Sequence, residues 1–419
     1  MDSNLSATLT TLSQWLEYLE KIHPQNIELG LERVRQVFQR MQLDFDHSKV
    51  IMVAGTNGKG TTCAMVEQAC LLAGKTVGVY SSPHLIDYRE RIKVNGAMLD
   101  EQQHVDAFTL IEDLRADISL TYFEFGTLAG LYLLAQQQPD VVLLEIGLGG
   151  RLDAVNIVEP DLSVITTIDL DHQDYLGDTR EKIGFEKAGI LRHQGEAIIG
   201  ETDPPQSLLQ QIKTLQVNAR FQGKDYLFEQ DAEGLCWQGE QKISSLPPAN
   251  IPLANAANAF AVIEWLDLAL SHQQFVQLMS SVKVSGRCQI LQNNPTVMLD
   301  VAHNPQSTGY LANKIDTMDY RQLHLVVAML KDKDIANSLI PLQRFSANWY
   351  TAGLAGPRGG TAEGLNQLLM PSQTVLSYLT VKDAYRKAVE NAHKDDLVVV
   401  FGSFHTVAEV LQLDPDEGN

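Results

Sequence analysis

Cysteine, basic residues and long apolar runs are all scarce in this chain of 419 residues. Its four cysteines form no C-x-x-C pair and have no regular spacing, which supports neither a disulfide framework nor a zinc site. We interpret them as packing residues. No apolar run approaches the length of a membrane span, so we expect no membrane-spanning segment and no membrane partner.

Acidic residues outnumber basic ones, since the chain has 52 Asp and Glu but only 32 Lys and Arg. Its formal net charge at pH 7 is −20. Such an acidic surface argues against nucleic acid, anionic lipid or heparin as a partner. Any anionic substrate must therefore be met by local lysines and arginines. The start of the chain, Met1-Asp2-Ser3-Asn4, lacks the basic region of a signal peptide, so we expect a cytoplasmic protein.

A glycine-rich turn carries the strongest chemical signal, Val53-Ala54-Gly55-Thr56-Asn57-Gly58-Lys59-Gly60-Thr61-Thr62. It follows an apolar run and precedes a segment with helical apolar spacing, which predicts a strand-to-helix turn. Glycines let backbone N–H groups approach an anion, the helix N-terminus adds positive potential, and Lys59 supplies charge for the outer phosphates. Although Gly60 separates Lys59 from Thr61, unlike the common G-x-x-x-x-G-K-[ST] pattern, we predict a nucleoside triphosphate site; a turn without a ligand is the alternative.

Acidic residues end or follow two predicted strands. Glu145 ends the apolar strand 141–145, a position from which an acid can hold Mg²⁺ beside a phosphate loop. Asp169-Leu170-Asp171-His172 follows the apolar strand 162–167 and could supply a second metal site. Taken singly, Glu145 could instead be a solvent-facing strand end, and His172 a structural histidine.

The fold class follows from length and alternation. Hydrophobic residues make up 44% of the chain, enough for two domains with cores of their own. Short β-rich runs alternate with longer amphipathic ones, which predicts a parallel α/β fold. We predict an N-terminal P-loop ATPase domain with a mostly parallel sheet over residues 1–286 and a C-terminal Rossmann-like α/β domain over 287–419.

Helices are predicted at 12–22 and 255–270, and a polar stretch at 221–245 alternates like hairpin strands before the breaker-rich 246–252. Strands are predicted at 50–54, 76–80, 141–145, 162–167, 197–199, 297–300, 323–328, 349–352 and 397–402.

Eight motifs occur in order along the chain: Gly55-Thr56-Asn57-Gly58-Lys59-Gly60, Ser81-Ser82-Pro83-His84, Leu120-Thr121-Tyr122-Phe123-Glu124, Glu145-Ile146-Gly147-Leu148-Gly149-Gly150-Arg151-Leu152-Asp153, Leu170-Asp171-His172, Glu186-Lys187-Ala188-Gly189-Ile190, Asp300-Val301-Ala302-His303-Asn304-Pro305 and Gly402-Ser403-Phe404-His405-Thr406. Their order resembles the folylpolyglutamate synthases of the Mur ligase superfamily, and in particular the bacterial bifunctional dihydrofolate synthase/folylpolyglutamate synthases. The likeness covers essentially the whole chain, and the shifted phosphate loop is this family's own form.

The resemblance implies an ATP-dependent ligase that adds L-glutamate to dihydropteroate and to reduced folates through an acyl phosphate. Catalysis by positioning and charge neutralisation then suits the metals, lysines and helix ends that the chain offers. The cofactors implied are ATP and two Mg²⁺ ions, and a monovalent cation is a further candidate. We expect a monomer, because the family closes its site within one chain.

The resemblance also assigns roles to residues. The catalytic set is Lys59, Lys187, His172 and His303. The ATP-binding set is Gly55, Thr56, Asn57, Gly58, Lys59, Gly60, Thr61, Asn255, Arg287 and Asp300. The metal ligands are Ser81, Glu145, His172 and Lys187. Lys187 matches a lysine that becomes N-carboxylated, which requires a neutral amine. Cys288 stands where the family pattern leads us to expect an aromatic residue, which puts the local packing and the nucleotide affinity in question.

The acceptor and the amino acid are assigned in the same way. The substrate-binding set is Ile27, Glu28, Leu29, Gly30, Ser82, Leu120, Thr121, Tyr122, Phe123, Arg151, Leu152, Asp153, His303 and Ser403. An aromatic face can stack on the pterin ring, and Asp153 can pair with its N–H donors. His303 and Ser403 match positions near the incoming glutamate.

Two alternatives to the folate ligase are less consistent with the sequence. A ligase of the same superfamily that adds an amino acid to a UDP-linked peptidoglycan precursor is disfavoured by residues 120–123 and by the Gly-Lys-Gly-Thr form of the loop. A nucleotide-dependent switch or binding protein without ligase chemistry would lack the second domain or Lys187, and both are present.

Overall fold

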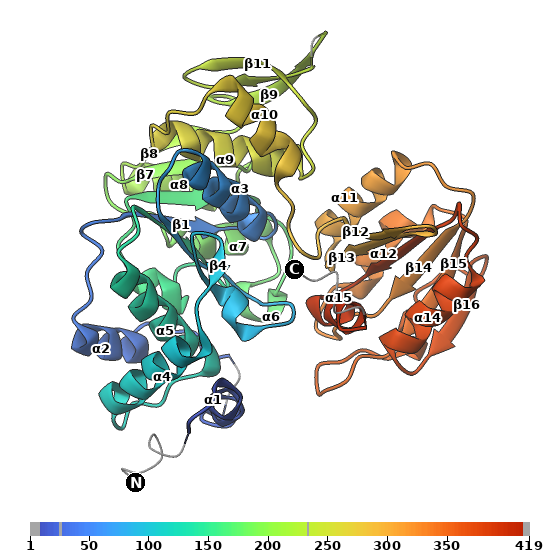
Figure 1. The fold of residues 1–419 in the computed structure, drawn as a ribbon, viewed down its shortest axis with the longest axis horizontal. Helices are drawn as coiled ribbons and strands as arrows, with labels where there is room; N and C mark the ends of the chain where they lie inside the picture. The colour runs from blue at the N-terminus through green and yellow to red at the C-terminus, as the bar shows by residue number, and fades with distance from the viewer. Residues whose placement is uncertain (1–8, 25–26, 233, 414–419) are drawn as a thin grey trace. The chain divides into compact units, whose positions relative to one another are not determined.

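The computed structural model describes residues 9–24, 27–232 and 234–413. The chain folds into two compact units, which are distinguished in Figure 1 by colour along the chain. The main change between them falls after Val282. Two short segments of the first part of the chain, Leu85–Asp87 and Asp169–Gly177, belong to the C-terminal unit. The functional boundary at residue 287 stays a prediction.

The N-terminal unit is built on an eight-stranded sheet with the order β4-β3-β2-β5-β1-β6-β7-β8. All neighbours are parallel except the hairpin of β3 and β4 at one edge, where β3 runs antiparallel to β2. The strands are β1 (Lys49–Ala54), β2 (Val77–Tyr80), β3 (Ile92–Val94), β4 (Ala97–Met98), β5 (Val141–Glu145), β6 (Leu162–Ile165), β7 (Glu196–Ile199) and β8 (Asn218–Phe221).

Helices cover this sheet, and its central strands are buried apolar runs, as expected for a parallel sheet covered on both faces. The helices of this unit are α1 (Leu12–Leu19), α2 (Glu32–Met41), α3 (Lys59–Leu72), α4 (Glu101–Arg115), α5 (Tyr122–Gln137), α7 (Arg180–Ala188), α8 (Gln206–Thr214), α9 (Leu253–Trp265) and α10 (His272–Ser281), with 3-10 turns η1 (Tyr88–Arg91) and η2 (Ala154–Ile157). A small antiparallel sheet packs on α9 and α10 (Figure 1), formed by β9 (Leu227–Asp231), β10 (Gly234–Gln238) and β11 (Lys242–Leu246).

The C-terminal unit holds a six-stranded sheet with the order β12-β13-β17-β14-β15-β16, in which only β12 is antiparallel. Its strands are β12 (Gln289–Asn293), β13 (Thr296–Asp300), β14 (Leu323–Val327), β15 (Ala347–Ala352), β16 (Thr374–Tyr378) and β17 (Leu397–Phe401). Its helices are α6 (Gln173–Leu176), α11 (Pro305–Asp316), α12 (Ile335–Gln343), α13 (Ala362–Asn366), α14 (Val381–Asn391) and α15 (Phe404–Leu411).

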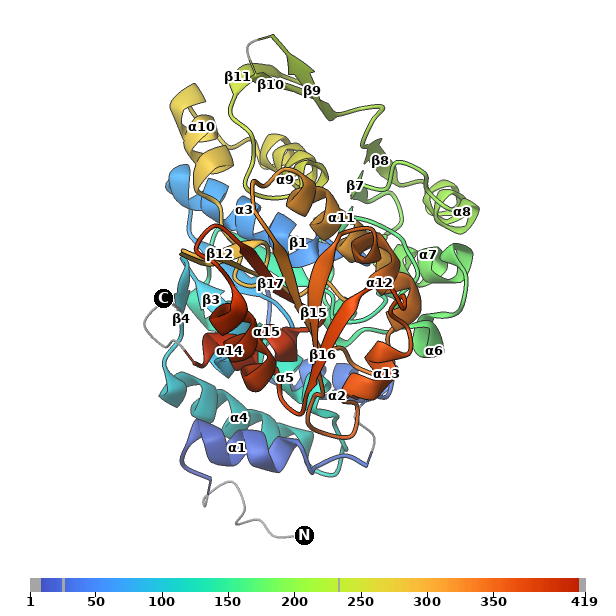
Figure 2. The ribbon, with the colours of Figure 1, turned by 90° about the vertical axis from the view of Figure 1, so that its right-hand side faces the viewer.

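Side chains alternate between the two faces of this sheet. On β14, Leu325 and Val327 join a core cluster with α11 and α12, whereas Val326 faces a second cluster with α14 and α15. The turned view in Figure 2 shows these helix pairs on opposite faces of the strands. The unit is therefore a three-layer α/β domain, with the carboxyl ends of β13, β17 and β14 side by side.

The predicted fold class is confirmed in both units. Every predicted strand is present within a few residues of its expected bounds, and the hairpin stretch forms β9 to β11. The short strands at or next to the sheet edges, β3, β4, β8, β12 and β16, were not predicted, because they are brief and only partly buried. No helix in the described part of the chain has the length and apolar content needed to cross a membrane.

Candidate active site

The glycine-rich loop joins β1 to α3 at the carboxyl edge of the N-terminal sheet. Lys59 begins α3, and its Nζ donates to the carbonyl oxygen of Gly55 at 2.9 Å. The residues directly after the neighbouring strand β6 support the loop, because Thr166 Oγ1 donates to the Asn57 carbonyl at 2.6 Å and the Asn57 N–H donates to Thr167 Oγ1 at 3.0 Å. The loop is thus shaped as an anion-binding turn at a helix N-terminus.

Gly58 is a position where only glycine fits without rearrangement. Its φ is +90°, and an added Cβ would lie 2.3 Å from Oδ1 of Asn255, a buried residue of α9. The structure therefore brings two predicted ATP-binding residues together, although they are far apart in sequence. Thr61, in the first turn of α3, is also buried.

Glu145 lies beside this loop at the end of β5. It is buried, and its carboxylate oxygens lie 3.5 and 3.7 Å from where a Cβ on Gly60 would be. The Ser82 N–H donates to Glu145 Oε2 at 3.4 Å, so the segment after β2 joins the same cluster. A carboxylate and hydroxyls beside a phosphate loop are the hard oxygen ligands that Mg²⁺ prefers, so these residues fit the implied metal.

The other predicted metal ligands, Ser81, Lys187 and His172, come from three other segments of the chain. Lys187 is buried near the end of α7 in the same unit, but His172 belongs to the C-terminal unit. Within residues 9–24, 27–232 and 234–413, no three His, Cys, Asp or Glu side chains form a group that could hold a metal ion. The four-residue ligand set accordingly stays a prediction.

The loop after β5 is anchored on α7 and on its own carboxylate. Arg151 Nη2 pairs with Glu186 Oε1 at 2.8 Å, and the Arg151 N–H donates to the Glu186 carbonyl. Asp153 is buried and caps η2, accepting the N–H groups of Leu148 at 2.8 Å and Val155 at 2.9 Å. Burial raises the pKa of Asp153 to about 6, against these two hydrogen bonds, which act to lower it.

The predicted pterin segment lies next to this loop. Thr121 and Glu124 form a capping box at the start of α5, which places Tyr122 and Phe123 in the first turn of the helix. The Phe123 ring covers Gly147, where an added Cβ would lie 2.5 Å from the ring. Leu120 is buried, and Leu152 follows Arg151 in the same loop. The structure thus brings Phe123 against the loop that leads to Arg151, Leu152 and Asp153, the other part of the predicted pterin site.

The loop Ile27–Gly30 approaches the same helix end through side chains of α2. Glu28 pairs with Arg33 and with His23, at 3.3 Å for His23 Nε2. Arg33 in turn binds Glu124. Of these residues only Glu28 was predicted, and His23, Arg33 and Glu124 were absent from the predicted site.

In the C-terminal unit, Asp300 ends β13 and is buried. It accepts the N–H groups of Cys288 at 2.8 Å and Ala302 at 2.7 Å, and burial raises its pKa. The Cys288 thiol also donates to Asp300 at 3.4 Å and packs against the core, which is the local role of the unexpected cysteine. Arg287 places its guanidinium 5.3 Å from the Phe404 ring centroid.

His303 and Ser403 follow the carboxyl ends of the adjacent strands β13 and β17. His303 Nδ1 lies 2.8 Å from the Val301 carbonyl oxygen, which fixes the ring, and the Phe404 ring centroid is 6.5 Å away. Ser403 is buried and caps α15, accepting the Thr406 N–H at 3.0 Å. The predicted glutamate residues therefore share one sheet edge with Arg287 and Asp300.

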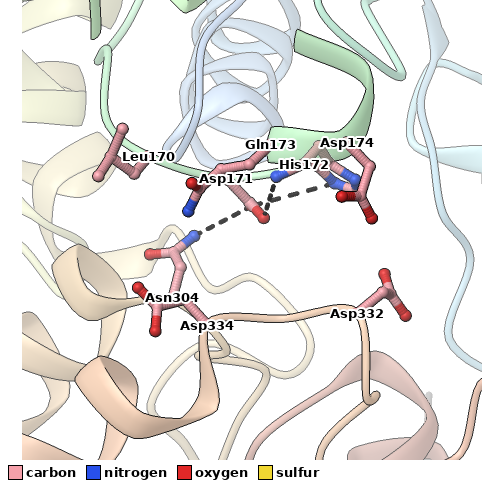
Figure 3. Close-up of a pocket in the computed structure, with 8 residues that line it drawn as sticks. All are labelled: Leu170, Asp171, His172, Gln173, Asp174, Asn304, Asp332 and Asp334. Atoms are coloured by element: carbon pink, nitrogen blue, oxygen red, sulfur yellow. Dashed lines mark hydrogen bonds and ion pairs between the residues drawn. The ribbon is translucent and has the colours of Figure 1, made fainter. Parts of the chain in front are cut away.

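A pocket in the C-terminal unit surrounds the acidic cluster that includes His172 (Figure 3). It is lined by Leu170, Asp171, His172, Gln173, Asp174, Asn304, Asp332 and Asp334. Asp171 accepts hydrogen bonds from Asn304 Nδ2 at 3.3 Å and Lys333 Nζ at 2.6 Å, and His303 Nε2 is 3.5 Å away. Although burial opposes it, His303 and the charges of His172 and Lys333 hold the pKa of Asp171 well below its usual range.

Lys333 was not predicted, yet its Nζ lies 3.1 Å from His172 Nε2 and its side chain is buried. A usable signal existed, because the charged run Lys331-Asp332-Lys333-Asp334 follows β14 closely. Charged groups near the carboxyl end of a parallel strand are candidates for a ligand site.

Two family models match the chain. The Mur ligase middle domain matches residues 53–263, and the Mur ligase glutamate ligase domain matches residues 286–404. These matches correspond to the parts of the chain that carry the phosphate loop and the second sheet.

Similar proteins align over almost the full length. The dihydrofolate synthase/folylpolyglutamate synthase of Haemophilus influenzae is 42% identical over 428 residues, covering 97% of this chain and 98% of that protein. The structure of E. coli FolC in complex with DHPP and ADP has a TM-score of 0.92 at 42% identity, covering 97% of this chain and 98% of that one. A bifunctional folylpolyglutamate synthase/dihydrofolate synthase structure with Mn, AMPPNP and L-glutamate bound has a TM-score of 0.90 at 46% identity, with the same coverage of both chains.

Proposed function

Because the chain belongs to the dihydrofolate synthase/folylpolyglutamate synthases of the Mur ligase family, we propose that it joins L-glutamate to dihydropteroate, forming dihydrofolate, and to reduced folates, forming folylpolyglutamates. The observation that carries this proposal is that one unit holds the phosphate loop, the Glu145 carboxylate at the neighbouring strand end, and the predicted pterin segment, whose Phe123 covers the loop after Glu145.

The chemistry proceeds by activation of a carboxylate. The γ-phosphoryl group of ATP is transferred to the acceptor carboxylate, giving ADP and an acyl phosphate. The amino nitrogen of glutamate then attacks the acyl carbon, loses a proton and expels inorganic phosphate. No covalent enzyme intermediate is formed, so the protein acts chiefly by positioning and charge neutralisation.

The loop residues supply the charge neutralisation. In the structure the Lys59 ammonium group rests on the Gly55 carbonyl, and with nucleotide bound it would turn to the outer phosphates. Glu145, with the Thr61 hydroxyl, would hold the divalent cation, whose charge offsets that of the phosphates. The roles of Ser81, His172 and the N-carboxylated Lys187 as further ligands are part of this proposal.

The acceptor and glutamate sites are assigned by the same argument. We place dihydropteroate against Tyr122 and Phe123, with Asp153 accepting N–H donors of the pterin ring. The buried Ser403 and the fixed His303 ring are proposed to orient glutamate. A monomer, two Mg²⁺ ions and a cytoplasmic location complete the proposal, supported by the family membership and the acidic composition.

The test is ADP release coupled to product mass, with purified protein, Mg²⁺, ATP and L-glutamate. Dihydropteroate and tetrahydrofolate are compared as acceptors. Products one glutamate heavier from both establish the bifunctional activity. Product from tetrahydrofolate alone would show that the protein is a polyglutamate synthase only. If neither acceptor gives a product, the alternative is a ligase that acts on a UDP-linked peptidoglycan precursor.

A further inference from the structure

The guanidinium group of Arg33 binds both the loop Ile27–Gly30 and the start of α5, two segments that carry predicted acceptor contacts. Arg33, in the first turn of α2, pairs through Nη1 with Glu28 of the loop Ile27–Gly30. Its Nη2 donates to both carboxylate oxygens of Glu124, at 3.1 and 3.3 Å, in the first turn of α5. The same nitrogen lies 3.4 Å from the Glu28 carbonyl oxygen, so backbone and side chain of the loop are both held.

The Glu124 partner is the reason why this contact affects the pocket. Its side chain is only 3% exposed, so its charge requires compensation inside the protein. Its Oε2 also accepts the Thr121 N–H at 2.8 Å, completing the capping box that positions Tyr122 and Phe123. Arg33 therefore acts on the helix turn that carries the predicted pterin contacts.

The Glu28 partner has a different environment. Its side chain is 38% exposed, and its loop has no regular secondary structure from Ile27 to Gly30. Ion pairs with Arg33 and His23 hold this side chain. Helix α2 also packs against η2, which begins directly after Asp153, so it contacts a third part of the pocket.

We infer that Arg33 is a positioning residue for the dihydropteroate site, whose guanidinium holds the loop Ile27–Gly30 and the start of α5 at a fixed separation. The inference rests on the proposed function for the identity of the acceptor. The contacts of Arg33 with Glu28 and Glu124, which we call the Arg33 clamp, lie within one unit, so the clamp can be tested independently of the reaction.

The kinetic test compares Arg33→Met, Arg33→Lys and Glu28→Gln with a control, Arg35→Met. Arg35 is an exposed residue on the same helix and loses the same charge. Because charge-assisted hydrogen bonds are lost, Arg33→Met should raise KM for dihydropteroate about tenfold and leave KM for ATP unchanged. Arg33→Lys should recover part of the loss, and Arg35→Met should match the wild type.

Hydrogen exchange of the substrate-free protein provides a readout that does not need activity. In Arg33→Met the amides of residues 27–30 and 121–124 should exchange faster than in Arg35→Met. Glu28→Gln releases only the half-exposed loop arm, so it should affect residues 27–30 alone and serves if Arg33→Met fails to fold.

Three results would overturn the inference. They are unchanged exchange in Glu28→Gln, an unchanged dihydropteroate KM in soluble Arg33 variants, or an equal rise in the KM values for ATP and dihydropteroate, which marks a merely structural residue. If the wild type makes no dihydrofolate, the proposed function fails, while the exchange data still decide whether the clamp exists.

Discussion

The two ends of α3 offer a matched test of the phosphate loop. Gly58 before the helix and Gly74 after it both have positive φ, +90° and +73°. A Cβ on Gly58 would lie 2.3 Å from Asn255 Oδ1, whereas no described atom lies within 4 Å of a Cβ on Gly74. Alanine at either position incurs the cost of a left-handed backbone, about 1–2 kcal/mol. Only Gly58→Ala must also displace Asn255.

We expect both variants to lower the free energy of unfolding, with the larger loss in Gly58→Ala. The ADP dissociation constant, measured by calorimetry with Mg²⁺, should be unchanged in Gly74→Ala. In Gly58→Ala it should rise at least about tenfold, equivalent to ~1.4 kcal/mol, because both the loop and Asn255 are predicted to bind nucleotide. Adding Asn255→Ala to Gly58→Ala should return the stability loss to that of Gly74→Ala, once the loss caused by Asn255→Ala alone is subtracted.

Equal stability losses in the two glycine variants, with ADP binding unchanged in both, would refute the packing argument at Gly58. A rise in the dissociation constant for Gly74→Ala as well would show that strain in α3, rather than the contact with Asn255, controls the site.

Three further predictions concern single side chains. Lys59→Ala should lower turnover by at least about a hundredfold, because it removes the charge aimed at the phosphates, and unchanged ADP release would contradict the phosphate assignment. Burial raises the pKa of Asp153 to about 6, so the side chain loses its charge as the pH falls through 6. The KM for dihydropteroate should therefore rise below pH 6 in the wild type but not in Asp153→Asn. If the two proteins show parallel pH profiles, Asp153 does not belong to the pterin pocket. Burial alone would raise the pKa of Asp396, but its hydrogen bonds, chiefly that from Arg321, lower the pKa to about 2. The ionised Asp396 therefore stabilises the fold fully above the unfolded pKa near 4, and this stabilisation is lost as the pH falls through 2. Asp396→Asn should therefore destabilise the C-terminal unit by about 2 kcal/mol at pH 7. Hydrogen exchange of β17 should show that the difference in stability between wild type and variant becomes smaller below pH 4. A difference that does not change with pH would contradict this account.

Much of the fold could be predicted because the strands that position the site are buried apolar runs. β1 and β5 have nearly continuous Val, Ile, Leu and Met sequences, which is the pattern of a covered parallel sheet. The edge strand β16 was missed because it alternates between exposed and half-buried residues and lies after a short helix. The short hairpin of β3 and β4 gives too few residues for a periodic signal.

The site was predictable where its residues follow strands in local motifs. Glu145 and the glycine loop are examples, since a strand end and a turn can be recognised from neighbouring residues. Arg33 gave no such signal, because its partners Glu28 and Glu124 lie at different distances along the chain and become neighbours only when α2 packs on α5. Pairings of this kind depend on tertiary packing, which local periodicity does not encode.

The segment Asp169–Gly177 also shows that a local sequence pattern does not reveal which unit a segment joins. Local pattern assigns it to β6, because it follows that strand directly. In the structure its Asp171 binds Lys333, which is 162 positions away, and the segment belongs to the C-terminal unit. His172 is therefore carried by the unit that holds His303 and Ser403, while Glu145 is carried by the other. Within the C-terminal unit, Lys333 Nζ lies 2.6 Å from Asp171 Oδ1 and 3.1 Å from His172 Nε2, so Lys333 anchors this segment. Lys333→Met should therefore speed amide hydrogen exchange in residues 170–173, and unchanged exchange would contradict this anchoring role.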